Sequence, residues 1–322
     1  MTAFVRPIDA HFDALEDWPY RPHDHLWDDL RVRYVDEGPI EGPVMLLLHG
    51  MPTWAYLYRD MIPGLVDAGY RCVAPDHLGF GRSDKPTDRA WYTIARHTEV
   101  LTSLIAALDL DDVTLVCQDW GGPIGLAQAA KTPERFSRLV VMNTWLHHPD
   151  YEYTDGARGW IGMWLPGGVF DRERPNVACV PLFSGELAPM SGLLTAVANG
   201  TEPVLDGAAA RNYAGWAAPF RDLPDDAFNG ARQFPLSIPL NDPVAGNAMA
   251  QAEHYRTLLA WPKPAHFVWG GADPVFTEPW GRAWAGRMGA TFDVIPEANH
   301  FLQNTHGAEV AEHILRRIAG HR

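Results

Sequence analysis

Residues 113–125 read Val-Thr-Leu-Val-Cys-Gln-Asp-Trp-Gly-Gly-Pro-Ile-Gly, and this stretch predicts a strand, a sharp turn and a helix. Residues 113–116 are apolar and rich in β-branched side chains, which is typical of a buried parallel strand. A helical pattern begins near residue 122 and runs towards residue 130. Asp119 therefore falls at the apex, in a layout that matches a nucleophile elbow with a carboxylate instead of serine. The pattern also fits an aspartate that caps an ordinary helix.

Strands and helices alternate on both sides of this stretch. Short apolar runs predict strands over residues 30–35, 44–48, 71–74, 138–142, 266–269 and 291–295. Helical patterns predict helices over residues 56–67, 93–108, 280–288 and 308–319. This alternation indicates βαβ units, so we expect an α/β fold with a mostly parallel central sheet flanked by helices.

The alternation stops after Asn143 and returns from Trp261. The intervening residues are rich in Gly, Pro and aromatic side chains and show only weak helical patterns. We expect a helical cap over residues 147–229, inserted between a first part (residues 1–146) and a second part (residues 230–322) of one sheet domain. At least four of the thirteen tryptophans lie between Trp145 and Trp216. They either pack a loop-rich core or line an apolar pocket with indole N–H donors.

Composition and charge exclude several classes of protein. The 322 residues carry a net charge of −14, which disfavours nucleic acids and anionic membranes as partners. The sequence shows neither an apolar signal core nor a run of membrane-span length, so we expect a cytoplasmic protein. The three cysteines, Cys72, Cys117 and Cys179, lack the spacing of a disulfide framework or a zinc site. No clustered spacing of ligand residues implies a metal or a cofactor.

Two later strand ends supply candidate partners for Asp119. Asp273 follows the predicted strand 266–269, and His300 follows the strand 291–295. Ligands of an open parallel sheet bind at the carboxyl ends of its strands, so all three side chains belong to the same edge. The order of nucleophile, acid and histidine along the chain is that of α/β-hydrolases. Taken singly, Asp273 also fits a turn residue before proline, and His300 an ordinary loop histidine.

Four motifs in the sequence carry a resemblance to a known family. They read His49-Gly-Met-Pro-Thr-Trp54, Pro75-Asp-His-Leu-Gly-Phe-Gly-Arg-Ser-Asp-Lys-Pro86, Gln118-Asp-Trp-Gly-Gly122 and Asn299-His-Phe-Leu-Gln303. With these motifs the sequence resembles the haloalkane dehalogenase family of α/β-hydrolases along nearly the whole chain. Residues 213–220, ending Ala-Ala-Pro-Phe, also resemble the end of that family's cap.

The resemblance implies a two-step hydrolysis. Asp119 would attack the carbon that bears the halogen, displace halide and form an alkyl ester. His300, oriented by Asp273, would then activate the water that hydrolyses this ester. The backbone N–H groups of Met51 and Trp120 would stabilise the oxyanion. The expected partners are a small apolar halogenated substrate and halide.

The binding site for the departing halide is where the sequence differs from the family. The Trp120 indole is placed to donate one N–H, but Met51 stands where some members have an Asn donor. Other members use a cap tryptophan, for which Trp160 and Trp164 are both candidates. We favour Trp164 as the second halide-binding residue, although its indole could instead pack the cap against the sheet.

Two other functions remain open from the sequence. An epoxide hydrolase would use the same triad, with cap tyrosines to protonate the opening oxygen, and Tyr151, Tyr153 and Tyr213 are available. The second is a non-catalytic relative that binds a ligand or partner, against which the complete triad argues. A serine esterase is disfavoured because the apex residue is Asp119.

Overall fold

The computed structural model describes residues 2–168 and 207–320, together with residues 170, 180 and 184. Part of the predicted cap and Cys179 lie outside the described residues. Cys72 and Cys117 are buried and carry free thiols. No helix in the described ranges is long and apolar enough to cross a membrane.

A central sheet of eight strands organises the molecule, in the order β10-β9-β8-β7-β4-β5-β3-β2. Strands from β10 to β5 pair in parallel, whereas β3 pairs antiparallel with both β5 and β2. The strands are β2 (His23–Trp27), β3 (Leu30–Glu37), β4 (Val44–Leu48), β5 (Arg71–Pro75), β7 (Val113–Gln118), β8 (Phe136–Met142), β9 (Ala265–Gly270) and β10 (Thr291–Ile295). The predicted mostly parallel sheet is confirmed.

The middle of the sheet forms the core of the fold. Every residue of β4, β7 and β9 is buried. Helices cover both faces of these strands, which explains why their sequences are continuously apolar instead of alternating. Two short strands, β1 (Phe4–Val5) and β6 (Lys85–Pro86), form a separate antiparallel pair.

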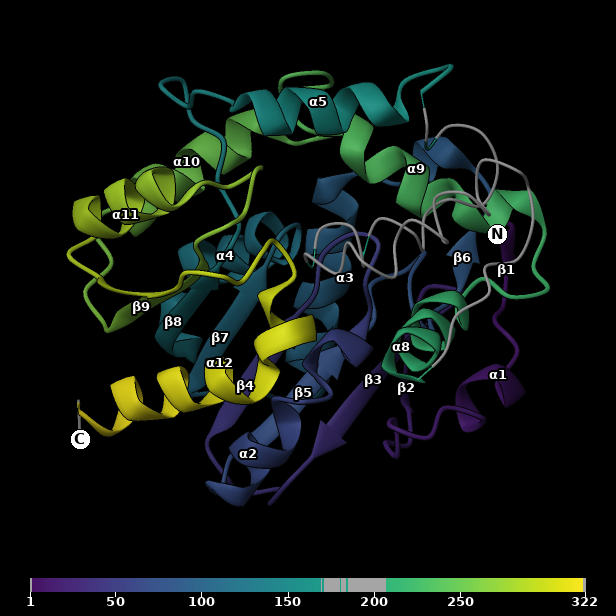
Figure 1. The fold of residues 1–322 in the computed structure, drawn as a ribbon, viewed down its shortest axis with the longest axis horizontal. Helices are drawn as coiled ribbons and strands as arrows, with labels where there is room; N and C mark the ends of the chain where they lie inside the picture. Colours follow the sequence, from purple (N-terminus) through teal and green to yellow (C-terminus); the bar gives the residue numbers. More distant parts are fainter. Residues whose placement is uncertain (1, 169, 171–179, 181–183, 185–206, 321–322) are drawn as a thin grey trace.

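Helices pack on both faces of the sheet (Figure 1). On one face α2 (Ile62–Asp67) contacts α12 (Leu302–Ala319). On the other face α4 (Gly121–Lys131) contacts both α3 (Ile94–Ala107) and α10 (Ala248–Leu258). Helix α11 (Glu278–Arg287) lies beside β9 and β10.

The helix predicted over residues 56–67 is two shorter elements, a 3-10 turn η1 (Ala55–Tyr58) and helix α2. Pro63 stands in the first turn of α2, where its missing N–H costs no helical hydrogen bond, so a new helix begins there. The other short elements are α1 (Ala10–Asp13), η2 (Arg89–Trp91) and η3 (Pro133–Arg135).

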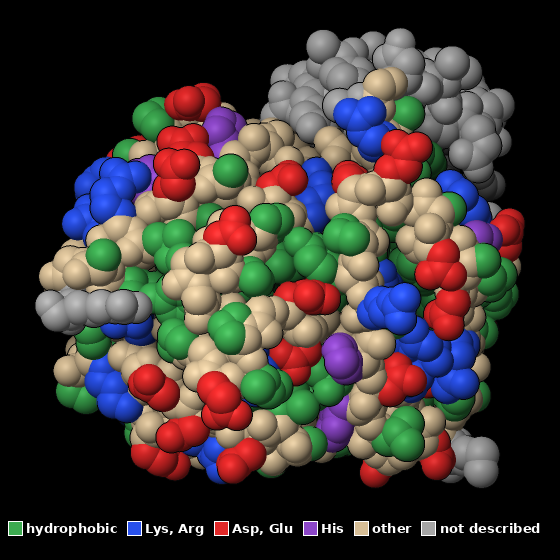
Figure 2. Space-filling view, turned by 90° about the horizontal axis from the view of Figure 1, so that it is seen from below, with side chains coloured by type: hydrophobic (Ala, Val, Ile, Leu, Met, Phe, Trp, Pro, Cys, Tyr) green, Lys and Arg blue, Asp and Glu red, His purple; other side chains and the backbone are tan. Residues whose placement is uncertain are grey.

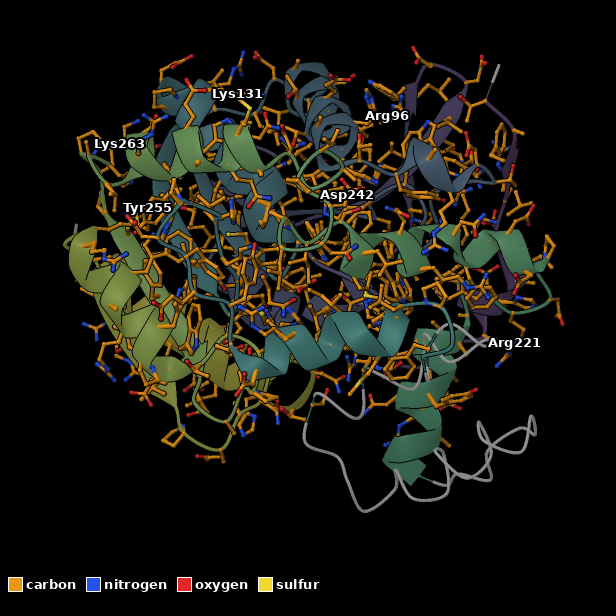
Figure 3. All side chains as sticks on the ribbon, turned by 90° about the horizontal axis from the view of Figure 1, so that it is seen from above. Arg96, Lys131, Arg221, Asp242, Tyr255 and Lys263 are labelled. Atoms are coloured by element: carbon orange, nitrogen blue, oxygen red, sulfur yellow. The ribbon has the colours of Figure 1, made fainter. Side chains whose placement is uncertain are left out.

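The described part of the predicted cap segment lies partly over the carboxyl end of the sheet. Its described part contains α5 (Asp155–Trp164), α8 (Gly207–Ala217) and η5 (Asp225–Phe228), and α5 contacts α9 (Asn229–Leu236). Figure 1 shows α5 above the strands, and Figure 3 shows it crossing the face seen from above. Asp242, labelled in Figure 3, shapes the turn between α9 and α10, because its Oδ1 accepts from the Val244 and Ala245 N–H groups at 3.0 and 2.9 Å.

The face seen in Figure 2 carries acidic and basic side chains interspersed among apolar ones. The described residues of this face therefore present no surface of a single sign, which would be needed to attract a polyanion.

Candidate active site

Asp119 lies at the apex of the turn between β7 and α4, as the sequence predicts. Its φ is +49°, in the left-handed region that non-glycine residues rarely adopt. Two hydrogen bonds hold this backbone: Asp119 N–H donates to Asn143 O at 3.1 Å, and Thr144 Oγ1 donates to Asp119 O at 2.5 Å. Gly121 completes the turn, because a Cβ there would lie 2.2 Å from Leu48 O. The strained turn thus presents the carboxylate at the carboxyl edge of the sheet.

The two carboxylate oxygens of Asp119 have different surroundings. Oδ1 accepts the Met51 backbone N–H at 2.8 Å, and a Cβ on Gly50 would lie 2.1 Å from this oxygen. Glycine at position 50 is therefore needed for the loop after β4 to approach the carboxylate. Oδ2 lies 3.5 Å from His300 Nε2. Within the described residues, the Trp120 backbone N–H makes no hydrogen bond to this carboxylate.

His300 and Asp273 meet as the sequence predicts. His300 Nδ1 lies 2.8 Å from Asp273 Oδ2, and both side chains are buried. The other oxygen, Asp273 Oδ1, accepts the backbone N–H groups of Val275 and Phe276 at 2.7 and 3.2 Å. A carboxylate held on both oxygens fixes the orientation of the imidazole, so Nε2 faces Asp119.

The charge around His300 controls its protonation. Burial lowers the pKa of His300, but the charge of Asp273 and the contacts with the two carboxylates outweigh burial and raise the pKa to about 10. The Gln118 amide nitrogen lies 3.1 Å from both His300 Nε2 and His300 O. An amide donor beside Nε2 suits the neutral imidazole, whereas the two carboxylates favour the imidazolium. The balance therefore depends on whether Asp119 carries its negative charge.

Asn143 is a site residue that the sequence reasoning missed. Its Nδ2 donates to Asp273 Oδ2 at 2.8 Å, and its Oδ1 accepts the Gly270 N–H at 2.8 Å. The signal available in the sequence was a polar residue directly after the apolar strand 138–142. That position places it at the same sheet edge as the three predicted residues.

A cavity of about 460 Å³, counting the space at its mouth, opens beside Asp119 and His300. Its wall is mostly apolar and aromatic. The side chains that contribute to it include Met51, Trp120, Trp145, Trp160, Ile238 and Phe276. The structure thus brings Met51, Asp119 and Trp120, together with the His300 imidazole, around one apolar space.

The predicted cap tryptophans differ in position. Trp160 lines the cavity, whereas Trp164 is not among its lining residues. The Trp164 ring packs edge-on against Trp160, with 5.3 Å between centroids, and its indole nitrogen is buried without a hydrogen-bond partner in the described residues. This geometry favours Trp160 over Trp164 as the cap donor, because Trp160 is the one of the two whose ring lines the cavity.

The tyrosines proposed for epoxide opening are also separated. Tyr153 lines the cavity, and its hydroxyl lies 3.0 Å from His147 Nδ1. Tyr151 instead packs against Trp280, with 5.2 Å between ring centroids, and neither Tyr151 nor Tyr213 lines the cavity. Among the described residues, no group of three or more His, Cys, Asp or Glu side chains is arranged to hold a metal ion.

Comparison with known proteins places this geometry in context. Residues 43–175 match the family model described as alpha/beta hydrolase fold. The chain is 38% identical to a haloalkane dehalogenase of Psychrobacter cryohalolentis, over 98% of this chain and 97% of that protein. It is 40% identical to haloalkane dehalogenase 1 of Mycobacterium tuberculosis, over 97% of each. Among solved structures, the tetrameric haloalkane dehalogenase DpaA from Paraglaciecola agarilytica superposes with a TM-score of 0.83 at 31% identity, covering 98% of both chains.

Proposed function

The chain belongs to the haloalkane dehalogenase family of the α/β-hydrolase fold, and we propose that it converts a haloalkane and water to an alcohol, a halide ion and a proton. One observation carries this proposal: Asp119 stands at a strained elbow with Oδ1 held by the Met51 N–H and Oδ2 facing His300 across an apolar cavity.

The first step is displacement of halide by Asp119. Oδ2 is the oxygen without a backbone donor from Met51, so its lone pair is the more available for attack. It forms a C–O bond as the C–X bond breaks, and the halide leaves with the bonding electrons. A carboxylate is ionised at neutral pH, so this step needs no base.

The second step is hydrolysis of the ester. Alkylation removes the negative charge of Asp119 and with it one cause of the raised pKa of His300. The pKa of His300 therefore falls, and the neutral imidazole takes a proton from the water that attacks Cγ of Asp119. The oxyanion forms on Oδ1, where the Met51 N–H already lies at 2.8 Å. Trp120 N–H would be the second donor after a small movement of the turn. Asp273 stabilises the imidazolium, which gives its proton to the alcohol oxygen as the bond between that oxygen and Cγ breaks. The alcohol leaves, and the regenerated carboxyl group of Asp119 releases the remaining proton to solvent.

We assign the halide to the indole N–H groups of Trp120 and Trp160. Both rings line the cavity beside the carboxylate. A halide that leaves water for an apolar space loses its hydration, so at least two donors are needed to offset that loss. Trp164, the residue favoured from the sequence, would support the Trp160 ring from behind.

The same positions argue against epoxide opening. An alkoxide is a poorer leaving group than halide, so ring opening needs an acid beside the substrate oxygen. Of the three tyrosines considered, Tyr153 alone lines the cavity, and its hydroxyl is already in contact with His147. The cap over residues 147–229, the cytoplasmic location and the absence of a nucleic-acid partner stay predictions.

A substrate panel tests the proposal. Purified protein is incubated with short chloro-, bromo- and iodoalkanes and with matched epoxides, while halide and diol release are followed. Halide release with a matching amount of alcohol is the expected result. Diol formation without halide release would overturn the assignment.

A further inference from the structure

Helix α5 begins directly on the loop that follows the triad acid. Thr154 is the N-cap residue of α5, and its Oγ1 accepts the Ala157 N–H at 3.1 Å. The same hydroxyl donates to Val275 O at 2.7 Å. One side chain therefore closes the first turn of α5 and binds that turn to a loop more than a hundred residues later in the chain.

Gly156 allows α5 to lie close to the loop that follows Asp273. A Cβ at position 156 would lie 1.9 Å from Pro274 O and 2.7 Å from its carbonyl carbon. Both obstructing atoms belong to the backbone, so no side-chain rotation could relieve the clash. Any larger residue at 156 would push α5 away from the loop after Asp273.

The opposite side of this loop holds the triad acid. The Val275 N–H donates to Asp273 Oδ1 at 2.7 Å, while the Val275 carbonyl accepts from Thr154. Asp273 Oδ2 in turn lies 2.8 Å from His300 Nδ1. A continuous chain of hydrogen bonds thus runs from α5 through Val275 and Asp273 to the imidazole.

Helix α5 also supplies a wall of the cavity. Ala157 and Trp160 line it from this helix, and Val275 and Phe276 line it from the loop. The first turn of α5 therefore sits between two parts of the site that are far apart in the sequence: the cap tryptophan and the support of the triad acid. Figure 3 shows α5 lying across this face of the molecule.

We propose that Thr154 is a positioning residue that holds the cap tryptophan Trp160 and the triad acid Asp273 in a fixed relative position. Gly156 allows the close approach on which this role depends. The kinetic part of this idea rests on the proposed function. Removing the Thr154 hydroxyl leaves the Val275 carbonyl without its donor and frees the start of α5. The loop and Asp273 then become more mobile together. One variant therefore changes both the halide affinity and the hydrogen bond and protonation of His300.

The test compares Thr154→Val with Thr154→Ser. Valine keeps the shape of the side chain and removes the hydroxyl, whereas serine keeps the hydroxyl. Thr93→Val is the matched control, because Thr93 caps α3 through the Arg96 N–H at 3.3 Å and lies outside the cavity wall. It removes a cap of the same kind without touching the loop after Asp273.

Three readouts separate positioning from mere stability. They are the low-field proton resonance of His300 Nδ1–H, the bromide affinity from tryptophan fluorescence and the pH profile of kcat. For Thr154→Val we expect an upfield shift or faster exchange of the resonance, weaker bromide binding and about a tenfold lower kcat. The acidic limb of the profile moves to lower pH, because a loosened Asp273 raises the pKa of His300 less. Thr154→Ser should restore all three.

The proposal is overturned if Thr154→Val loses thermal stability like Thr93→Val but leaves the resonance, bromide affinity and pH profile unchanged. If Thr154→Val does not fold, Gly156→Ala keeps the hydroxyl, displaces α5 and should produce the same three changes. If the wild-type protein releases no halide, the proposed function fails, while the His300 resonance still decides whether Thr154 positions Asp273.

Discussion

Asn143 Nδ2 donates to Asp273 Oδ2 at 2.8 Å, the same oxygen that meets His300 Nδ1. Asn143 itself has a φ of +28° directly after β8, so the end of one strand supports the acid that follows the next. Asn143→Gly keeps this backbone conformation and removes the amide. We expect a loss of about 1–3 kcal/mol in the free energy of unfolding and a lower kcat. Denaturant unfolding and halide release measure the two effects; wild-type values for both would refute the role.

Asp119→Ala should abolish halide release and leave the far-UV circular dichroism unchanged. The variant removes the carboxylate that forms the ester in the proposed mechanism, while the elbow backbone keeps its contacts with Asn143 and Thr144. Alanine is preferred to asparagine, because slow deamidation of asparagine could regenerate the carboxylate. Undiminished turnover would rule out Asp119 as the nucleophile.

His300→Phe should separate the two chemical steps. In the proposed mechanism the imidazole acts only after the ester forms, so this variant is expected to release about one halide per active site and then stop. Mass spectrometry should find the alkyl group on the peptide that carries Asp119. Failure to release that first halide, with substrate still bound, would mean that His300 is also needed for alkylation.

The halide donors are distinguished by single indole replacements. Bromide should quench the fluorescence of the wild-type protein saturably, and Trp120→Phe or Trp160→Phe should weaken bromide binding about tenfold by removing one N–H. Trp164→Phe is the comparison, since its ring packs behind Trp160 and does not line the cavity. Normal binding in Trp160→Phe with loss in Trp164→Phe would return the role to Trp164.

Stability should fall in mild acid because of three buried histidines. Burial lowers the pKa of His77 to about 4 and those of His49 and His97 well below the usual value. Below about pH 6.5 these histidines take up protons in the unfolded chain but not in the folded protein, so the free energy of unfolding decreases from there towards pH 4.

The contribution of His300 to stability has the opposite pH dependence. Its pKa is raised to about 10, so its contribution is complete below about pH 6.5 and is lost towards pH 10.

His97→Phe tests the acid side of this behaviour. Both ring nitrogens of His97 are buried without partners in the described residues, among the rings of Tyr92 and Phe234. Phenylalanine removes the titrating group and the unsatisfied nitrogens, so the variant should gain stability, more at pH 5 than at pH 8. Equal gains at both pH values in denaturant titrations would contradict the assignment.

The sequence by itself determined the central sheet and the order of Asp119, Asp273 and His300 at the ends of its strands. Strands β4 and β10 have the predicted bounds, and α3 lies inside its predicted range. For β4 the reason is that burial on both faces leaves a continuous apolar run, which local pattern can reveal. Asp119, Asp273 and His300 were predictable because parallel strands end at one edge whatever lies between them in the chain.

Only the tertiary structure decided contacts that depend on packing between distant segments. The sequence pattern of α5 is compatible with either Trp160 or Trp164 lining a pocket. The contact between α5 and Val275 decides that Trp160 lines it. Asn143 and Thr154 carry no local signal of their partners, since Asp273 lies 130 positions and Val275 lies 121 positions further along the chain. Hydrogen bonds of such sequence separation exist only once the sheet has brought the strand ends together.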